Sequence, residues 1–193
     1  MSADQDLPIV EHADRESWRG WLDAHHASLQ GVWLKFAKQR SPSMTVTYGE
    51  ALEEAICFGW IDGQVRRYDE HFYLQRFTPR RRRSKWSQAN REKAERLIEA
   101  GRMTTAGQAH VDAAKADGRW EAAYPAQSNA TVPEDLQREL DRNPSAKAFF
   151  ETLTGSTRYA FLYRLHHVTK PDRRAKRIAG YIELLNKGRT LQD

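Results

Sequence analysis

Strand-like sequence in this chain is confined to one early stretch, and that confinement limits the folds open to it. Residues 32–38, 60–66 and 72–77 are rich in aromatic and β-branched side chains, which are typical of strands. Residues 68–71 lie between the last two runs as a turn, so these runs are predicted to form an antiparallel hairpin. Most other apolar residues recur at the helical period. The sequence therefore predicts an α+β fold, with a small antiparallel sheet packed by helices and followed by a C-terminal helical bundle.

Capping residues mark where several of the predicted helices begin. Asp14 precedes an apolar stripe that includes Trp18 and Leu22, and Asp is a preferred N-cap residue. Thr47 with Glu50 three positions later has the spacing of a capping box. Further helices are predicted from Ser87 to Gly101, from Thr104 to Gly118, after Pro133, after Asn143, after Gly155-Ser156, and from Pro171 to Gly188.

The segment 121–132 interrupts this regular pattern. It contains Pro125 and has neither a helical nor a strand period, so it is predicted to be a linker. The predicted organisation is an α+β domain at 1–120, the linker at 121–132, and a C-terminal helical region at 133–193.

Composition favours a cytoplasmic protein in a reducing compartment. No apolar run approaches the ~20 residues that span a bilayer, and the first residues, Met1-Ser-Ala-Asp-Gln-Asp, are acidic, unlike a signal peptide. We therefore expect a cytoplasmic location and no membrane span. The single Cys57 leaves no partner for an internal disulfide. It falls at the C-terminal end of its predicted helix, where the helix dipole raises a thiol pKa, so it is predicted to be structural.

Positive charge is concentrated in two segments of the chain. Residues 76–102 carry ten Lys and Arg against three Glu, and residues 158–189 carry nine against two acidic residues. Each segment therefore has a net charge of +7, whereas the whole chain has +5, so the remainder is at −9. The distribution predicts that these segments either meet an anionic partner or pair with the acidic remainder.

Both basic segments include the start of a predicted helix. Free N–H groups there attract anions, and arginine binds phosphate through two hydrogen bonds. Cations at a helix start are unfavourable because they oppose the helix dipole. Their presence there indicates that the charge has another use, such as binding an anion. We therefore predict an anionic ligand, a phosphorylated metabolite or a nucleic acid, bound between the two segments. The alternative is that both are solvated surface. The predicted anion-binding residues are Arg80, Arg81, Arg83, Ser84, Lys85, Trp86, Ser87, Lys170, Arg173, Arg174 and Arg177.

Two other function classes stay open on the sequence. Trp86 beside the arginines is a possible stacking surface for bases, which is the hypothesis of a nucleic-acid-binding regulator. An enzyme would use side chains in a cleft beside the sheet, and the candidates are Tyr48, Asp62 and His71. No phosphate-binding loop, nucleophile elbow or His-Glu-x-x-His motif occurs. A non-catalytic protein without a cofactor is therefore preferred.

Metal binding is not predicted. The adjacent pairs His25-His26 and His166-His167 diverge on a helix, whereas two ligands on one helix face need a spacing of three or four.

Ordered sequence blocks occur at 32–36, 47–48, 50–55, 57–64, 76–81, Ser84, 86–87, Asn90, 97–98, Gly101, Met103, Gly107, 118–120, 132–136 and 174–178. From about Trp18 to Gly188, these blocks resemble the YdeI/OmpD-associated (bacteriocin-protection) family. The residues at 166–172 depart from the pattern of relatives, although the basic character is kept. The resemblance implies a link to bacteriocin protection and envelope stress, and it transfers no catalytic residues.

Overall fold

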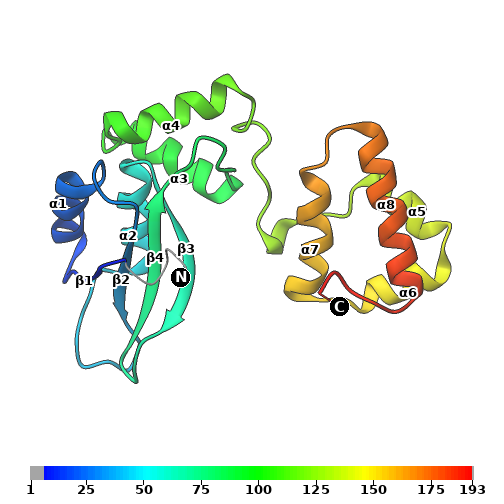
Figure 1. Cartoon of the computed structure of the whole chain (residues 1–193), viewed down its shortest axis with the longest axis horizontal. Coiled ribbons are helices and arrows are strands. Elements are labelled where there is room, and N and C mark those ends of the chain that lie inside the picture. The colour runs from blue at the N-terminus through cyan, green and yellow to red at the C-terminus, as the bar shows by residue number, and fades with distance from the viewer. Residues whose placement is uncertain (1–6, 193) are drawn as a thin grey trace. The chain divides into compact units, whose positions relative to one another are not determined.

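A computed structural model describes residues 7–192. They form two compact units, and the division falls between Ala123 and Tyr124. Figure 1 shows the sheet in the first unit and only helices in the second. The α+β fold class with a helical C-terminal region is thereby confirmed. In the first unit the elements are β1 (Ile9–Glu11), α1 (Arg15–His25), β2 (Val32–Ala37), α2 (Tyr48–Cys57), β3 (Trp60–Arg67), β4 (Phe72–Pro79), α3 (Gln88–Glu99) and α4 (Thr105–Ala116).

The sheet has the strand order β1-β2-β4-β3. The hairpin of β3 and β4 is antiparallel, as predicted, and β4 also pairs antiparallel with β2. Strand β1 adds to the edge in parallel with β2, through the register Ile9 to Trp33. It was not predicted, because three residues are too short to show a strand period.

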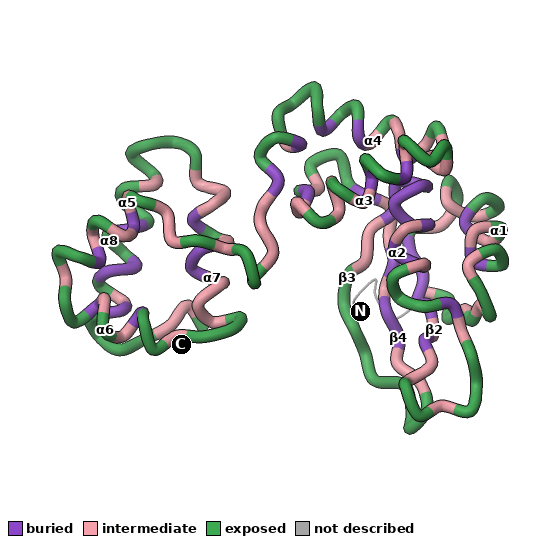
Figure 2. The backbone as a smooth tube through the Cα atoms, turned by 180° about the vertical axis from the view of Figure 1, so that it is seen from behind, coloured by how far each residue is buried: buried purple, intermediate pink, exposed green. Residues whose placement is uncertain are grey.

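The first core lies between the sheet and the helices. In β2 the side chains alternate, and Val32, Leu34 and Phe36 belong to the core that also buries Trp18 of α1 and Ile56 of α2. Figure 2 shows this buried layer along β2, β4 and α2. The Trp18 indole donates to the carbonyl oxygen of Ala51 at 3.1 Å, which ties α1 to α2. Apolar burial and this bond together fix the helix pair on the sheet.

The predicted caps form. Asp14 and Thr47 both make complete capping boxes, and Ser87 and Thr104 accept from backbone N–H groups in the first turns of α3 and α4. These interactions are local in sequence, which is why the sequence predicted them.

Helix α4 packs closely against the end of α2. Gly107 faces the Cys57 carbonyl so tightly that a β-carbon there would overlap it. Cys57 itself is buried. Burial first, and then the Glu54 carboxylate, raise the pKa of the thiol to about 11. The thiol is therefore structural, as predicted. The main cause of its raised pKa is burial rather than the helix dipole.

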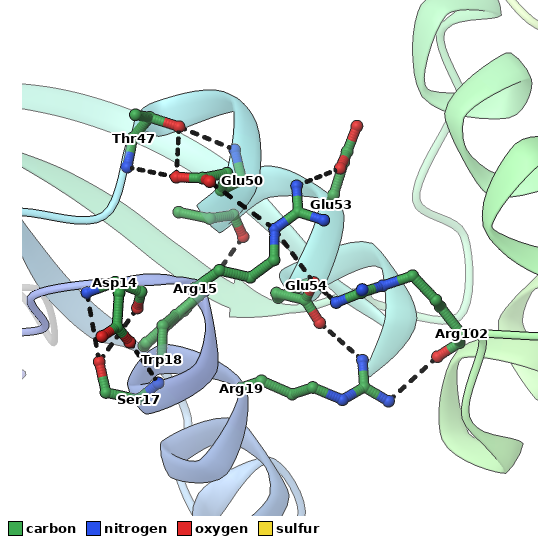
Figure 3. A network of polar contacts seen from close by, with 11 residues as sticks. Asp14, Arg15, Ser17, Trp18, Arg19, Thr47, Glu50, Glu53, Glu54 and Arg102 are labelled. Atoms are coloured by element: carbon green, nitrogen blue, oxygen red, sulfur yellow. Dashed lines mark hydrogen bonds and ion pairs between the residues drawn. The ribbon is translucent and has the colours of Figure 1, made fainter. Parts of the chain in front are cut away.

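A buried carboxylate joins three parts of the first unit. Glu54 of α2 is fully buried and accepts a hydrogen bond from Arg19 of α1 at 2.6 Å. Arg102, between α3 and α4, binds its other oxygen, and Arg15 of α1 lies 3.8 Å from that oxygen. Figure 3 shows the cations converging on this carboxylate. Such burial is tolerated only because the charge is paired.

The second unit is helical and has its own core. Pro144 and Pro171 stand at the first positions of their helices, where proline is favoured. The core includes Leu136, Phe150, Phe161 and Ile182. The elements are η1 (Gln127–Asn129), α5 (Glu134–Asp141), α6 (Pro144–Thr152), α7 (Gly155–His166) and α8 (Pro171–Asn186).

The segment predicted as a linker is partly structured. Ala123 is buried in the core of the first unit beside Trp120, and Gln127–Asn129 forms a short 3-10 helix. The division into the predicted domains stays a prediction.

Candidate anion-binding site

The first basic segment begins with an arginine that belongs to the protein interior. Arg80 is 4% exposed, and its guanidinium lies 3.6 Å from the centroid of the Trp86 ring. It also donates to the Lys85 carbonyl at 3.2 Å. Trp86 packs edge-on against Trp120, with ring centroids 4.9 Å apart. Arg80 and Trp86, both predicted ligand residues, therefore stabilise the fold, and the Trp86 ring is covered rather than available for a stacked base.

The two serines of this segment bind the backbone. The Ser84 hydroxyl accepts from the N–H of Arg81 at 2.9 Å and closes a turn, and the Ser84 carbonyl accepts from Arg119 at 2.8 Å. The Ser87 hydroxyl accepts from the N–H of Asn90 at 3.2 Å and caps α3. The hydroxyls are thus used within the loop. The exposed cations of this segment are Arg81, Arg82, Arg83 and Lys85.

One arginine of the second basic segment is also structural. Arg174 binds the Asp135 carboxylate through two nitrogens, one of them at 3.0 Å. It donates further to the carbonyls of Leu165, at 2.8 Å, and Val168, at 3.3 Å, at the end of α7. The hydrogen bond from Arg174 holds the pKa of Asp135 below its usual value. Arg174 therefore joins α5, α7 and α8, and it does not line the hollow formed by the other cations of this segment.

The other cations of this segment surround one hollow, which we call the basic pocket. Lys170, Arg173 and Arg177 were predicted, and Lys176 lies with them. At about 100° per residue, positions 173, 176 and 177 share one flank of α8. The cavity has a volume of about 540 Å³. Its lining residues are His167, Val168, Thr169, Lys170, Arg173, Lys176 and Arg177.

Among the residues that the structure describes, no carboxylate lines the basic pocket, although Asp172 stands between Lys170 and Arg173 in the first turn of α8. Within residues 7–192, none of the four Lys and Arg side chains forms an ion pair, and no Asp or Glu lines the cavity. The four positive charges therefore face one hollow together. Such an arrangement attracts a ligand that carries several negative charges.

One wall of the pocket is held by packed rings. The His167 ring lies edge-on to Tyr163, at 4.7 Å, and to Tyr124, at 5.7 Å. Sequence reasoning considered His167 only as a metal ligand and left Lys176 out of the site. The spacing of three and four from Arg173 was the signal that identifies Lys176 and Arg177 as its neighbours.

The predicted catalytic cleft does not assemble. The Tyr48 hydroxyl donates to Asp62 at 2.9 Å, so these two side chains meet. Asp62 pairs with Phe77 across the hairpin, whereas His71 lies six residues before Phe77, which is about 20 Å along an extended strand. His71 lies instead in the turn, where its backbone N–H donates to the Asp69 carboxylate at 2.8 Å. The three residues therefore cannot share a proton relay.

In the part of the chain that the structure describes, no helix is long and apolar enough to cross a membrane. Within the same residues, no group of three His, Cys, Asp or Glu side chains is placed to hold a metal ion.

Two family models match the chain. One, described as Domain of unknown function (DUF8412), matches residues 10–110. The other, described as Bacteriocin-protection, YdeI or OmpD-Associated, matches residues 129–188 and confirms the resemblance over that range. The basic pocket lies wholly inside this second range. The match suggests a function related to bacteriocin protection. No curated protein and no solved structure matches the chain.

Proposed function

We propose an anion-binding function for this chain, which belongs to the family described as Domain of unknown function (DUF8412) through residues 10–110 and carries a YdeI/OmpD-associated domain at residues 129–188. In this proposal it is a non-catalytic cytoplasmic protein of bacteriocin protection that binds a phosphate-bearing ligand in the basic pocket.

The observation that carries the proposal is the set of four cations without an acidic partner. Lys170, Arg173, Lys176 and Arg177 line one cavity. Holding like charges together costs free energy unless a counter-charge binds, and Asp135, the acid that pairs with this segment, is occupied by Arg174. A phosphate offers several acceptor oxygens to such a set of donors.

The proposal gains support from the contrast with Arg174. That residue shows how an arginine of this segment is used when it stabilises the fold: it has a carboxylate and two carbonyl partners. Arg173, its neighbour in sequence, lines the cavity instead. This difference supports a role of the pocket cations in binding an anion rather than in packing the fold.

Calorimetric titration with inorganic tripolyphosphate at low salt tests the proposal. We expect binding by the full chain that weakens as salt is added, because the attraction is screened. The triple variant Lys170→Ala, Arg173→Ala, Arg177→Ala should lose at least about tenfold in affinity, since one hydrogen bond to a charged group is worth about 1.5–3 kcal/mol and about 1.4 kcal/mol corresponds to a factor of ten.

Lys187→Ala is the matched control. Lys187 is exposed at the far end of α8 and does not line the pocket, so this variant should bind like the wild type. Equal affinity of the triple variant and the wild type would refute the site. Binding of single-stranded or duplex oligonucleotides in preference to tripolyphosphate, with the same loss in the triple variant, would assign the pocket to nucleic acid instead.

A further inference from the structure

We infer that the basic pocket binds a compact oligophosphate as the free anion, without a divalent metal ion. This inference rests on the proposed function and names the ligand class of the same site. It predicts that Mg²⁺ competes with the protein for the ligand.

The size of the cavity favours a ligand with several phosphates. About 540 Å³ lies within the range of about 300–1,000 Å³ that small-molecule sites occupy, which is more than one orthophosphate fills. Four Lys and Arg side chains line it. A chain of two or three linked phosphates carries the matching number of negative charges in a small volume.

The lining offers little that a hard metal ion could bind. Mg²⁺ prefers carboxylate oxygens together with phosphate oxygens. The pocket has no carboxylate and no carboxamide, and the Thr169 hydroxyl is the one side-chain oxygen among its lining residues. A metal ion that entered with the ligand would therefore bring further positive charge to four cations, with no acid to compensate it.

Two carboxylates of this unit, those of Asp135 and Glu139, line a different hollow. A second groove, of about 450 Å³ between α5 and α8, is lined by Asp135 and Glu139 among others. In that groove Asp135 is bound by Arg174. The two hollows share Thr169, but the carboxylates belong to one and the four cations of the basic pocket to the other. Because no carboxylate lines the basic pocket, recognition there would rest on direct contact between its cations and phosphate oxygens.

The consequence is a competition for the same oxygens. Mg²⁺ bound to tripolyphosphate occupies oxygens that the arginines need and cancels part of the ligand charge. Sites that take metal-bound nucleotides commonly supply an acidic residue for the metal. In the basic pocket, binding should instead be tightest when the metal is removed.

Titration of the full-length wild type with tripolyphosphate, in EDTA and then in excess Mg²⁺, tests this inference. Sodium chloride keeps the two solutions at the same ionic strength. We expect affinity to fall by about tenfold or more in Mg²⁺, because two charges of the ligand are neutralised. Lys187→Ala should show the same fall.

The variant Thr169→Asp provides a second measurement. Thr169 is exposed, so the change should leave the fold intact, and it adds the missing carboxylate. We expect weaker binding in EDTA and a smaller penalty from Mg²⁺. An unchanged Mg²⁺ penalty in this variant would contradict the assignment of the effect to the pocket.

The outcomes separate the inference from the function on which it rests. If tripolyphosphate binds the wild type equally well or better with Mg²⁺, and the pocket variants still lose affinity, the metal-free mode is wrong and the anion site stands. If tripolyphosphate binds in neither solution, the proposed function itself is refuted.

Discussion

The two basic segments carry the same net charge of +7, yet the protein uses their arginines in different ways. In the loop from Arg80 to Ser87, the first arginine is buried on a tryptophan and both serines bind the backbone. Around α8, four cations line one cavity and one arginine is bound by an acid. Charge density in a sequence therefore does not distinguish arginines that stabilise from arginines that bind, whereas their burial and partners do.

The largest effect should come from the buried arginine of the first segment. Arg80→Ala removes the guanidinium from the Trp86 ring and its bond to the Lys85 carbonyl. We expect a loss of about 2 kcal/mol in the free energy of unfolding, measured by chemical denaturation. Arg81→Ala, one position on and exposed, is the control and should change it by less than about 0.5 kcal/mol. Similar losses of unfolding free energy in the two variants would contradict the structural role assigned to Arg80.

Arg174→Ala and Arg173→Ala make the corresponding pair in the second segment. Arg174→Ala should cost about 1–2 kcal/mol of stability, because it breaks the bonds to Asp135, Leu165 and Val168, and should leave tripolyphosphate affinity nearly unchanged. Arg173→Ala should lower the tripolyphosphate affinity and leave the stability nearly unchanged. Denaturation and calorimetry of the same preparations measure both quantities, and a large loss of affinity in folded Arg174→Ala would contradict its structural role.

The contribution of Arg174 should depend on pH. The hydrogen bond from Arg174 lowers the pKa of Asp135 from 3.8, so the charged carboxylate is favoured in the folded state. The associated stability is fully present above that value and is lost as the pH falls through the lowered folded pKa. The difference in stability between the wild type and Arg174→Ala should therefore shrink below about pH 4. A difference that stays constant down to pH 2 would exclude Asp135 as its source.

Ser87→Ala should have a smaller effect, of about 1 kcal/mol, because it removes the N-cap of α3. Ser87→Asp keeps a capping oxygen and should retain most of the stability. Thermal denaturation distinguishes the two. If Ser87→Ala lowers tripolyphosphate affinity without lowering stability, the serine belongs to a ligand site, as the sequence predicted.

The smallest effect should come from the exposed loop arginines. The double variant Arg81→Ala, Arg83→Ala should alter stability by less than about 0.5 kcal/mol and should leave tripolyphosphate affinity unchanged if the basic pocket is the complete site. A clear loss of affinity would instead support the predicted site formed by both segments. That shared site stays a prediction.

Features set by local contacts were predictable, and features set by distant contacts were not. The helix starts at Asp14 and Thr47 were predictable because a capping side chain and the backbone N–H that it binds lie three residues apart. Arg80 could not be told from the other arginines of its run, since its burial depends on Trp86 and on a packed Trp120. Likewise the helical period separates Arg173 from Arg174, but only the folded unit shows that Asp135 meets the second of them.

The buried Glu54 has a consequence for how the first unit moves. Its partners Arg19 and Arg102 come from positions 35 and 48 residues away along the chain. If α1 alone separated from α2, the Glu54 carboxylate would lose Arg19 and keep Arg102 as its bound cation, which leaves a charge in the protein interior only partly paired. The helix pair and the α3–α4 connection should therefore open in one cooperative step, with backbone amides of α1 and α2 exchanging with deuterium at a shared free energy.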